Sequence, residues 1–151
     1  MFRRVGLSAT AGAAVAVALL AFSVPASAAT EARAPEAVLK NVATGFCLDS
    51  NANKQAYTHD CNGGSYQKWT VSSGTTLTNL ATGFCLDSNA NKQAYTHDCN
   101  GGSYQKWTLS RGTHGTTLKN LATGFCLDSN ANKQLYTHDC NGGSYQQWNG
   151  I

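Results

Sequence analysis

One repeated segment constrains the fold of this chain more than any other feature. The segment CLDSNANKQAYTHDCNGGSYQKW begins at Cys47, recurs unchanged at Cys85 and recurs with two substitutions at Cys126. Internal repetition of this kind is typical of proteins in which each copy is one structural unit that packs against its neighbours. We therefore expect three equivalent repeats, over residues 39–76, 77–117 and 118–151.

Each copy has the pattern of short β-strands and contains no apolar stripe of helical period. In the first copy we expect strands over residues 39–42, 46–50, 55–59 and 67–71, separated by the turn segments ATG, NANK and CNGGS. Three copies are too few for the common β-propellers. The pattern therefore predicts an all-β fold of three four-stranded repeats, closed on itself so that no sheet edge is exposed.

Alternation along the strands assigns side chains to faces. Leu48 should point to the core and its neighbour Asp49 away from it, while Ala56 should point to the core and Tyr57 away from it. The third copy has Leu135 in place of this alanine, which is an apolar change on the expected core face. Asp49 and Tyr57 should therefore lie on the same side of the sheet.

The six cysteines fall two to a repeat with the same spacing in each. An even number at a fixed spacing in an exported chain predicts disulfides. Repetition favours pairing within each copy, although the sequence leaves other connectivities open, and the spacing is too wide for a zinc knuckle. The favoured pairs are Cys47–Cys61, Cys85–Cys99 and Cys126–Cys140.

The first 28 residues have the pattern of a secretory signal peptide, with basic residues, a short apolar run and the small residues ASA. We expect a flexible tail over residues 29–38 and one domain over residues 39–151, secreted once the signal is removed. Loss of Arg3 and Arg4 leaves nine basic and eight acidic residues, so the mature charge gives no footprint for nucleic acid.

A family resemblance rests on GFCLD, the second cysteine and the Gln-x-Trp of YQKW or YQQW, which all three copies contain. These motifs resemble the ricin B-type lectin domain, which implies a β-trefoil with one disulfide per repeat and carbohydrate binding without catalysis. The longer pattern LDSN, YT and NGGSYQKW is similar to the actinohivin-like subgroup, which implies binding of high-mannose, α-linked mannobiose glycans. The resemblance covers residues 39–151.

The resemblance implies one sugar site per repeat, made of an Asp, two Tyr and an Asn, with a Gln supporting the Asp. The chemistry agrees, because sugars need a charged acceptor for hydroxyl groups and an aromatic wall for their C–H face. These residues are Asp49, Tyr57, Asn62, Tyr66 and Gln67 in the first copy, Asp87, Tyr95, Asn100, Tyr104 and Gln105 in the second, and Asp128, Tyr136, Asn141, Tyr145 and Gln146 in the third.

The chain also departs from the subgroup at three positions of each copy, which bear on the identity of the sugar. His59 and Asp60 stand where the subgroup usually has an apolar residue and a proline, and Ala52 replaces an aromatic residue. His59, His97 and His138 are possible further sugar contacts. Lys54 and its copies read as solvated turn residues.

Other functions fit the sequence less well. The segment from Asp49 to Asp60 resembles a calcium loop, but Lys54 replaces its glycine and no helices flank it. Asp49 and Asp60 could form a glycosidase pair, but alternation puts them on opposite faces. Binding of xylan or galactosides, and a trefoil inhibitor or toxin subunit, are the remaining alternatives. We expect a monomer that binds glycans multivalently, with no cofactor, metal, nucleic-acid partner or membrane insertion.

Overall fold

The structure is a computed structural model, and it describes residue 12, residues 34–72 and residues 75–151. All the described strands belong to one unit, which lies within residues 32–151. Apart from Gly12, the expected signal peptide lies outside the described residues, as do residues 29–33 of the expected tail, and both stay predictions.

Each repeat contains four short strands and one turn of 3-10 helix, as the turn signals of the sequence require. The first repeat has β2 (Lys40–Asn41), β3 (Cys47–Ser50), β4 (Ala56–His59), η1 (Ser65–Gln67) and β5 (Trp69–Val71). The second has β6 (Leu77–Asn79), β7 (Cys85–Ser88), β8 (Ala94–His97), η2 (Ser103–Gln105) and β9 (Trp107–Arg111). The third has β10 (Thr116–Asn120), β11 (Cys126–Ser129), β12 (Leu135–His138), η3 (Ser144–Gln146) and β13 (Trp148–Asn149).

Two details differ from the expected elements. Gln67 lies in η1 and not in a strand, because the chain makes a 3-10 turn before Trp69 begins β5. Glu36–Ala37 form a further strand, β1, which pairs antiparallel with β5. The expected flexible tail therefore does not extend through Glu36–Ala37, since Ala37 packs against the hydrophobic core.

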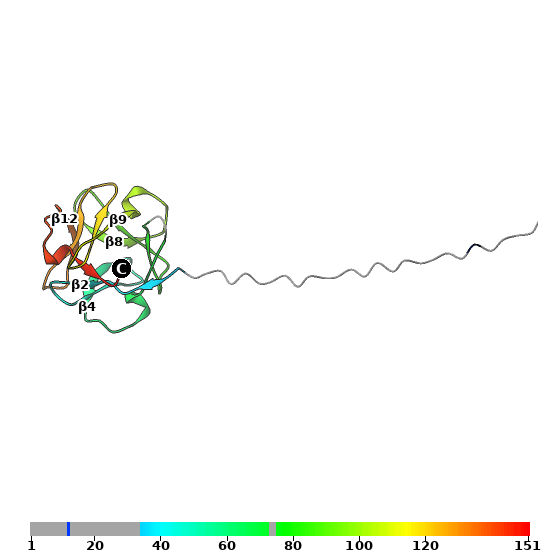
Figure 1. Cartoon of the computed structure of the whole chain (residues 1–151), viewed down its shortest axis with the longest axis horizontal. Helices are drawn as coiled ribbons and strands as arrows, with labels where there is room; N and C mark the ends of the chain where they lie inside the picture. The colour runs from blue at the N-terminus through cyan, green and yellow to red at the C-terminus, as the bar shows by residue number, and fades with distance from the viewer. Residues whose placement is uncertain (1–11, 13–33, 73–74) are drawn as a thin grey trace, which may run out of the picture. The chain divides into compact units, whose positions relative to one another are not determined.

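The repeats join in a ring through pairing of their outer strands. The last strand of each repeat pairs antiparallel with the first strand of the next, as β5 with β6, β9 with β10 and β13 with β2. Pairing of β13 with β2 brings the red end of the chain beside its cyan beginning (Figure 1). This closed ring with a hairpin in each repeat is the β-trefoil that the sequence predicted.

The core is assembled from the same side chains of each repeat. One tryptophan and two leucines per copy are fully buried: Trp69, Trp107 and Trp148 with Leu39, Leu48, Leu77, Leu86, Leu118 and Leu127. Each indole N–H donates to the backbone carbonyl of one of these leucines, as from Trp69 to Leu48 at 3.1 Å. Burial of side chains this large is the main source of stability in a small domain.

Three hairpins cover this core and carry the polar face outward. In β3 and β4, Asp49 lies opposite Tyr57, and the equivalent pairs recur in the other two hairpins. Leu135 belongs to the core cluster, as does Ala94, which confirms the assignment of faces by alternation. None of the 3-10 turns in the described residues is long and apolar enough to cross a membrane.

Candidate functional site

Three equivalent hollows open on the outer face of the hairpins, one in each repeat. The hollow around Asp49 has a volume of about 540 Å³, and those around Asp87 and Asp128 about 330 Å³ each. The three hollows share eight lining positions: one aspartate, one serine, one histidine, one glycine, two asparagines and two tyrosines. In the first repeat these are Asp49, Ser50, Asn51, Tyr57, His59, Asn62, Gly64 and Tyr66.

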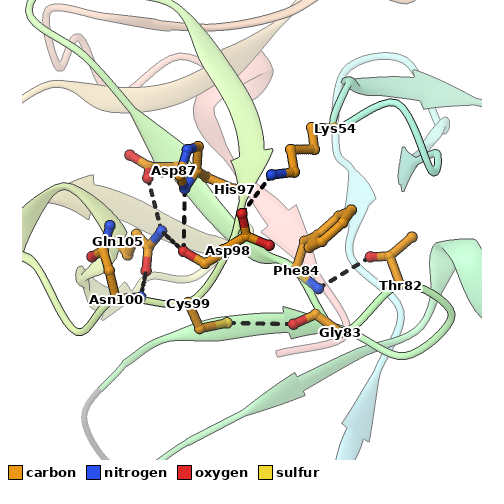
Figure 2. Close-up of polar contacts among 10 residues, drawn as sticks. All are labelled: Lys54, Thr82, Gly83, Phe84, Asp87, His97, Asp98, Cys99, Asn100 and Gln105. Carbon is orange, nitrogen blue, oxygen red and sulfur yellow. Dashed lines mark hydrogen bonds and ion pairs between the residues drawn. The ribbon is translucent and has the colours of Figure 1, made fainter.

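A buried glutamine joins the parts of each hollow. Figure 2 shows this in the second repeat, where Gln105 Nε2 donates to Asp87 Oδ2 and to the Asp98 carbonyl, both at 2.9 Å. The Asn100 backbone N–H donates to Gln105 Oε1 at 2.9 Å. Gln105 is fully buried, so one amide side chain fixes the carboxylate relative to the loop that follows the hairpin. Gln105 therefore contacts the aspartate as expected, while its role in a sugar site stays a prediction.

The carboxylate at the base of each hollow has acceptor capacity to spare. Asp49, Asp87 and Asp128 are only 5–6% exposed, and each lines its hollow. Among the described residues, Asp87 Oδ1 and Asp128 Oδ1 accept no hydrogen bond, whereas Asp49 Oδ1 accepts one from the Ser50 N–H at 2.8 Å. A buried carboxylate oxygen without a donor is costly unless a ligand supplies the hydrogen bond.

Two tyrosines form the walls and differ in their surroundings. Tyr57 is half-buried, and its hydroxyl donates to the Ser50 carbonyl at 3.4 Å. Burial raises the pKa of this hydroxyl above its usual 10.0, and the Asp49 carboxylate adds to the rise, so the group stays protonated. Tyr66 is 43% exposed and also lines the hollow. The hollow thus combines a fixed wall with an accessible one.

The loop after the second cysteine supplies the remaining polar groups. Asn62 Oδ1 accepts from the Gly64 N–H at 2.8 Å, so the side chain also shapes the turn as the Asn-Gly signal suggests. Gly63 has a φ of 71°, in the left-handed region that glycine adopts readily. A Cβ on Gly64 would lie 2.9 Å from Asn62 Oδ1. Close packing of Asn62 on this backbone therefore keeps the side chain at the hollow.

All three disulfides pair within a repeat, as Cys47–Cys61, Cys85–Cys99 and Cys126–Cys140. The favoured connectivity is confirmed. Each bridge joins the first strand of a hairpin to the loop that carries the asparagine of the hollow. The covalent link and the glutamine therefore hold this loop from two sides.

The lysine at the hairpin turn is partly exposed, as the sequence suggested, but it also has a charged partner that the sequence did not reveal. Lys54 Nζ forms an ion pair with Asp98 Oδ2 at 2.5 Å, in the next repeat. The Lys54 hydrogen bond holds the pKa of the Asp98 carboxyl below its usual 3.8. The equivalent contact pairs Asp60 with Lys133. The carboxylate that would close the calcium loop therefore pairs with a lysine. No group of three or more potential metal ligands occurs among the described residues.

Three lining positions shared by all three hollows were not among the predicted site residues, and Ala52 and Asn53 line the first hollow in addition. The three shared positions are the serine and asparagine after the aspartate and the second glycine of the turn, as in Ser50, Asn51 and Gly64. Asn51 could have been found by alternation, because it stands two residues after Asp49 and so shares its face. Ser50 is the last residue of β3, and alternation puts it on the face opposite Asp49. Gly64 has no side chain, so alternation gives no signal for it.

Comparison with known proteins identifies the family of this domain. Residues 36–148 match the ricin-type beta-trefoil lectin domain. Comparison with curated proteins gives no match.

Similar solved structures include a designed threefold symmetric protein, ThreeFoil, at 25% identity and a TM-score of 0.68, covering 75% of this chain and 95% of that one. The hemolytic lectin CEL-III matches at 18% identity and a TM-score of 0.68, over 77% of this chain and 30% of CEL-III. The cytolethal distending toxin of Haemophilus ducreyi matches at 14% identity and a TM-score of 0.67, over 77% of this chain and 82% of the toxin chain. The last two show the fold alone. The chain belongs to the ricin-type β-trefoil lectin domain family.

Proposed function

We propose that this chain is a carbohydrate-binding lectin without catalytic activity, with one site in each of its three hollows. The observation that carries the proposal is the carboxylate at the base of each hollow, which is nearly buried and held by a buried glutamine. It lies beside two tyrosines and an asparagine in an open concave surface. Convergent polar groups in such a concavity are typical of a ligand site.

The groups suit a neutral sugar. Two adjacent hydroxyls can donate to the carboxylate, and hydrogen bonds to an ionised acceptor are stronger than neutral ones. The exposed Tyr66 ring can cover the C–H face of the sugar. A carboxylate at the base disfavours acidic sugars because like charges repel. Among neutral sugars we propose mannose-type glycans, on the resemblance of the repeated motif to the actinohivin-like subgroup.

Binding at one hollow should be weak and binding at three much stronger. An open site with one carboxylate and two rings should have a Kd on the order of 0.1–1 mM, or about 4–5.5 kcal/mol. Three such sites on one rigid domain can raise avidity for a branched or clustered glycan by about 10²–10⁴. We therefore propose multivalent binding by a monomer.

Export is part of the proposal, because the amino-terminal pattern is that of a signal peptide and the domain holds three disulfides. Disulfides persist in oxidising surroundings outside the cytosol. Secretion into the culture medium, with cleavage near residue 28, is the expected outcome when the full chain is expressed in a secreting host. Retention of the uncleaved chain in the cytosol would contradict this part.

The test is a glycan panel that includes mannose-type oligosaccharides, xylan fragments and galactosides. The protein released from its signal peptide should bind the mannose-type members, and binding should be lost in the triple variant Asp49→Asn, Asp87→Asn, Asp128→Asn. The matched control is His114→Ala, an exposed turn residue outside the hollows, which should bind like the wild type. Binding that survives the triple change would refute the proposed sites, and preference for xylan or galactosides would correct the sugar class.

Two further arms separate this proposal from its rivals. EDTA should leave binding unchanged, because Asp60 is paired with a lysine. The protein should release no reducing ends from mannan. Binding restored by calcium after EDTA would favour the calcium loop, and hydrolysis abolished by Asp49→Asn would favour an enzyme.

A further inference from the structure

Three lysines connect the repeats in a ring through contacts outside the hollows. Each stands at the turn of one hairpin and forms an ion pair with the aspartate that follows the hairpin of the next repeat. The pairs are Lys54–Asp98 at 2.5 Å, Lys92–Asp139 at 2.8 Å and Lys133–Asp60 at 2.6 Å. The third pair runs from the last repeat back to the first, so every repeat gives one lysine and receives another.

Each lysine is held by more than its ion pair. Lys54 Nζ lies over the Phe84 ring of the second repeat, 5.0 Å from its centroid, and the Lys54 carbonyl accepts from the Thr96 N–H at 3.0 Å. Lys54 has a φ of 63°, and a residue with a Cβ in this left-handed region costs about 1 kcal/mol. Glycine or asparagine would adopt this backbone more easily, so the contacts of the lysine side chain offset a local strain.

The partner of Lys54 belongs to the loop that shapes the neighbouring hollow. Asp98 stands between His97, which lines that hollow, and Cys99, which is followed by the lining residue Asn100. Its carbonyl accepts from Gln105 Nε2 at 2.9 Å, and the same nitrogen donates to Asp87. Figure 2 shows the unbroken series of contacts from Lys54 through Asp98 and Gln105 to Asp87.

The other wall of the same hollow is held by the repeat that follows. The carbonyl of Tyr104 accepts from Asn120 Nδ2 at 2.7 Å, and Asn120 is buried in β10 of the third repeat. The hollow around Asp87 is thus braced from the first repeat at its loop and from the third repeat at its tyrosine. No single repeat contains all the contacts that fix its own hollow.

We propose that Lys54 is a positioning residue for the site around Asp87, and that Lys92 and Lys133 serve the sites around Asp128 and Asp49 in the same way. This inference rests on the proposed function, because it names what sets the affinity of each sugar site. The loop at each site is therefore positioned by a lysine of the preceding repeat. Lys54 does not touch the sugar and acts through Asp98 and the backbone of Asn100.

The expected effect is modest. Lys54 and Asp98 have side chains that are 39% and 65% exposed, and exposed ion pairs contribute little. The contact with Phe84 is also of the weak, exposed kind. We expect loss of Lys54 to weaken one site by about 2–5-fold, which corresponds to the range measured for exposed pairs.

The test uses proteins with one intact site. Asp49→Asn with Asp128→Asn leaves only the site around Asp87, and calorimetry with α-linked mannobiose gives its Kd. In this background Lys54→Gln should raise the Kd about 2–5-fold, and Lys54→Arg should restore it. Lys40→Gln, at an exposed residue of β2, should leave the Kd unchanged. High salt should narrow the difference in Kd between the protein with Lys54 and the Lys54→Gln variant, because salt screens exposed ion pairs.

The direction of the ring gives the decisive outcome. When only the site around Asp128 is intact, the effect should move to Lys92→Gln, and when only the site around Asp49 is intact, to Lys133→Gln. An unchanged Kd for Lys54→Gln at the Asp87 site would overturn the proposal. So would an equal loss from Lys54→Gln in all three backgrounds, which would indicate a general effect on the fold.

A ligand-free measurement keeps this inference separate from the proposed function. Backbone NMR should show larger shift changes and faster local motion at Cys99 and Asn100 in Lys54→Gln than at the equivalent residues of the other repeats. If the parent protein binds no sugar, the proposed function fails while this loop measurement still decides the positioning role. Unchanged signals at Cys99 and Asn100 would overturn the role of Lys54 whatever the protein binds.

Discussion

The contacts within one repeat and the contacts between repeats hold the same hollow by different means. Within the second repeat, a disulfide and the fully buried Gln105 fix the loop and the carboxylate. Between repeats, an ion pair of Lys54 with Asp98 reaches the same loop at the exposed surface. The first set is covalent or shielded from water, whereas the second is open to salt and to pH.

This difference indicates a division of roles. Buried hydrogen bonds and covalent links determine whether the hollow forms at all. A buried donor or acceptor that loses its partner costs about 1–3 kcal/mol. Exposed ion pairs contribute about 0–1 kcal/mol and can adjust a loop without deciding the fold. Changes inside a repeat should therefore reduce stability and binding strongly, and changes between repeats should reduce both only slightly.

The largest effect is expected from reduction of the three disulfides. Each closes a loop with a sequence separation of 14, which corresponds to about 3 kcal/mol of loop-closure entropy. Losing all three removes a large part of the stability of a small domain. Denaturant unfolding with and without reductant measures this loss. If the reduced protein is as stable as the oxidised one, the contacts within a repeat do not dominate the stability of the domain.

A smaller effect, confined to one site, is expected from Gln105→Ala. The change leaves Asp87, the Asp98 carbonyl and the Asn100 N–H without their shared partner. We expect a loss of about 1–3 kcal/mol in the free energy of unfolding and loss of sugar binding at this site.

Gln134→Ala is the matched control, because Gln134 is exposed and its side chain bonds only to Asn130 among the contacts described. It should change stability by about 0.5 kcal/mol or less. Denaturant unfolding and calorimetry of both variants make the comparison. Full binding stoichiometry in Gln105→Ala would show that the buried contacts do not build the site.

The smallest effect is expected from acid acting on the contacts between repeats. Lysine hydrogen bonds hold the pKa of the carboxyls of Asp60, Asp98 and Asp139 below 3.8 in the folded protein. A lowered folded-state pKa gives stability that is present above the unfolded pKa of 3.8 and lost as the pH falls through the folded value. The stabilisation is therefore present at pH 5 and is lost as the pH falls below 3.8 and through the lowered pKa of the folded state.

Thermal unfolding of the wild type and of the triple variant Lys54→Gln, Lys92→Gln, Lys133→Gln checks this expectation. The wild type should have a Tm a few degrees higher at pH 6, and the two curves should converge in acid. A difference in Tm that stays constant from pH 6 to pH 2.5 would show that the lysines stabilise the domain by packing alone.

The sequence predicted the parts that depend on local pattern and repetition. The three repeats, the faces of Asp49 and Tyr57 and the pairing of Cys47 with Cys61 followed from alternation and spacing, and the structure confirms them. The contact of Lys54 with Asp98 could not be predicted, because it joins residues 44 positions apart whose approach depends on how the cores of two repeats pack. The resemblance supplied the carboxylate's partner Gln67, which the structure places in a 3-10 turn.

The most direct measurement of the three-site function is the calorimetric stoichiometry of α-linked mannobiose on a stepwise series. The wild type, Asp87→Asn, Asp87→Asn with Asp128→Asn, and the full triple variant should bind three, two, one and no sugars per chain, as expected from one carboxylate in each hollow. The Kd of the remaining sites should stay nearly constant, while avidity for mannan falls far more steeply than the number of sites. A single Asp87→Asn change that abolishes all binding, or one that leaves the stoichiometry at its original value, would contradict three independent sugar sites.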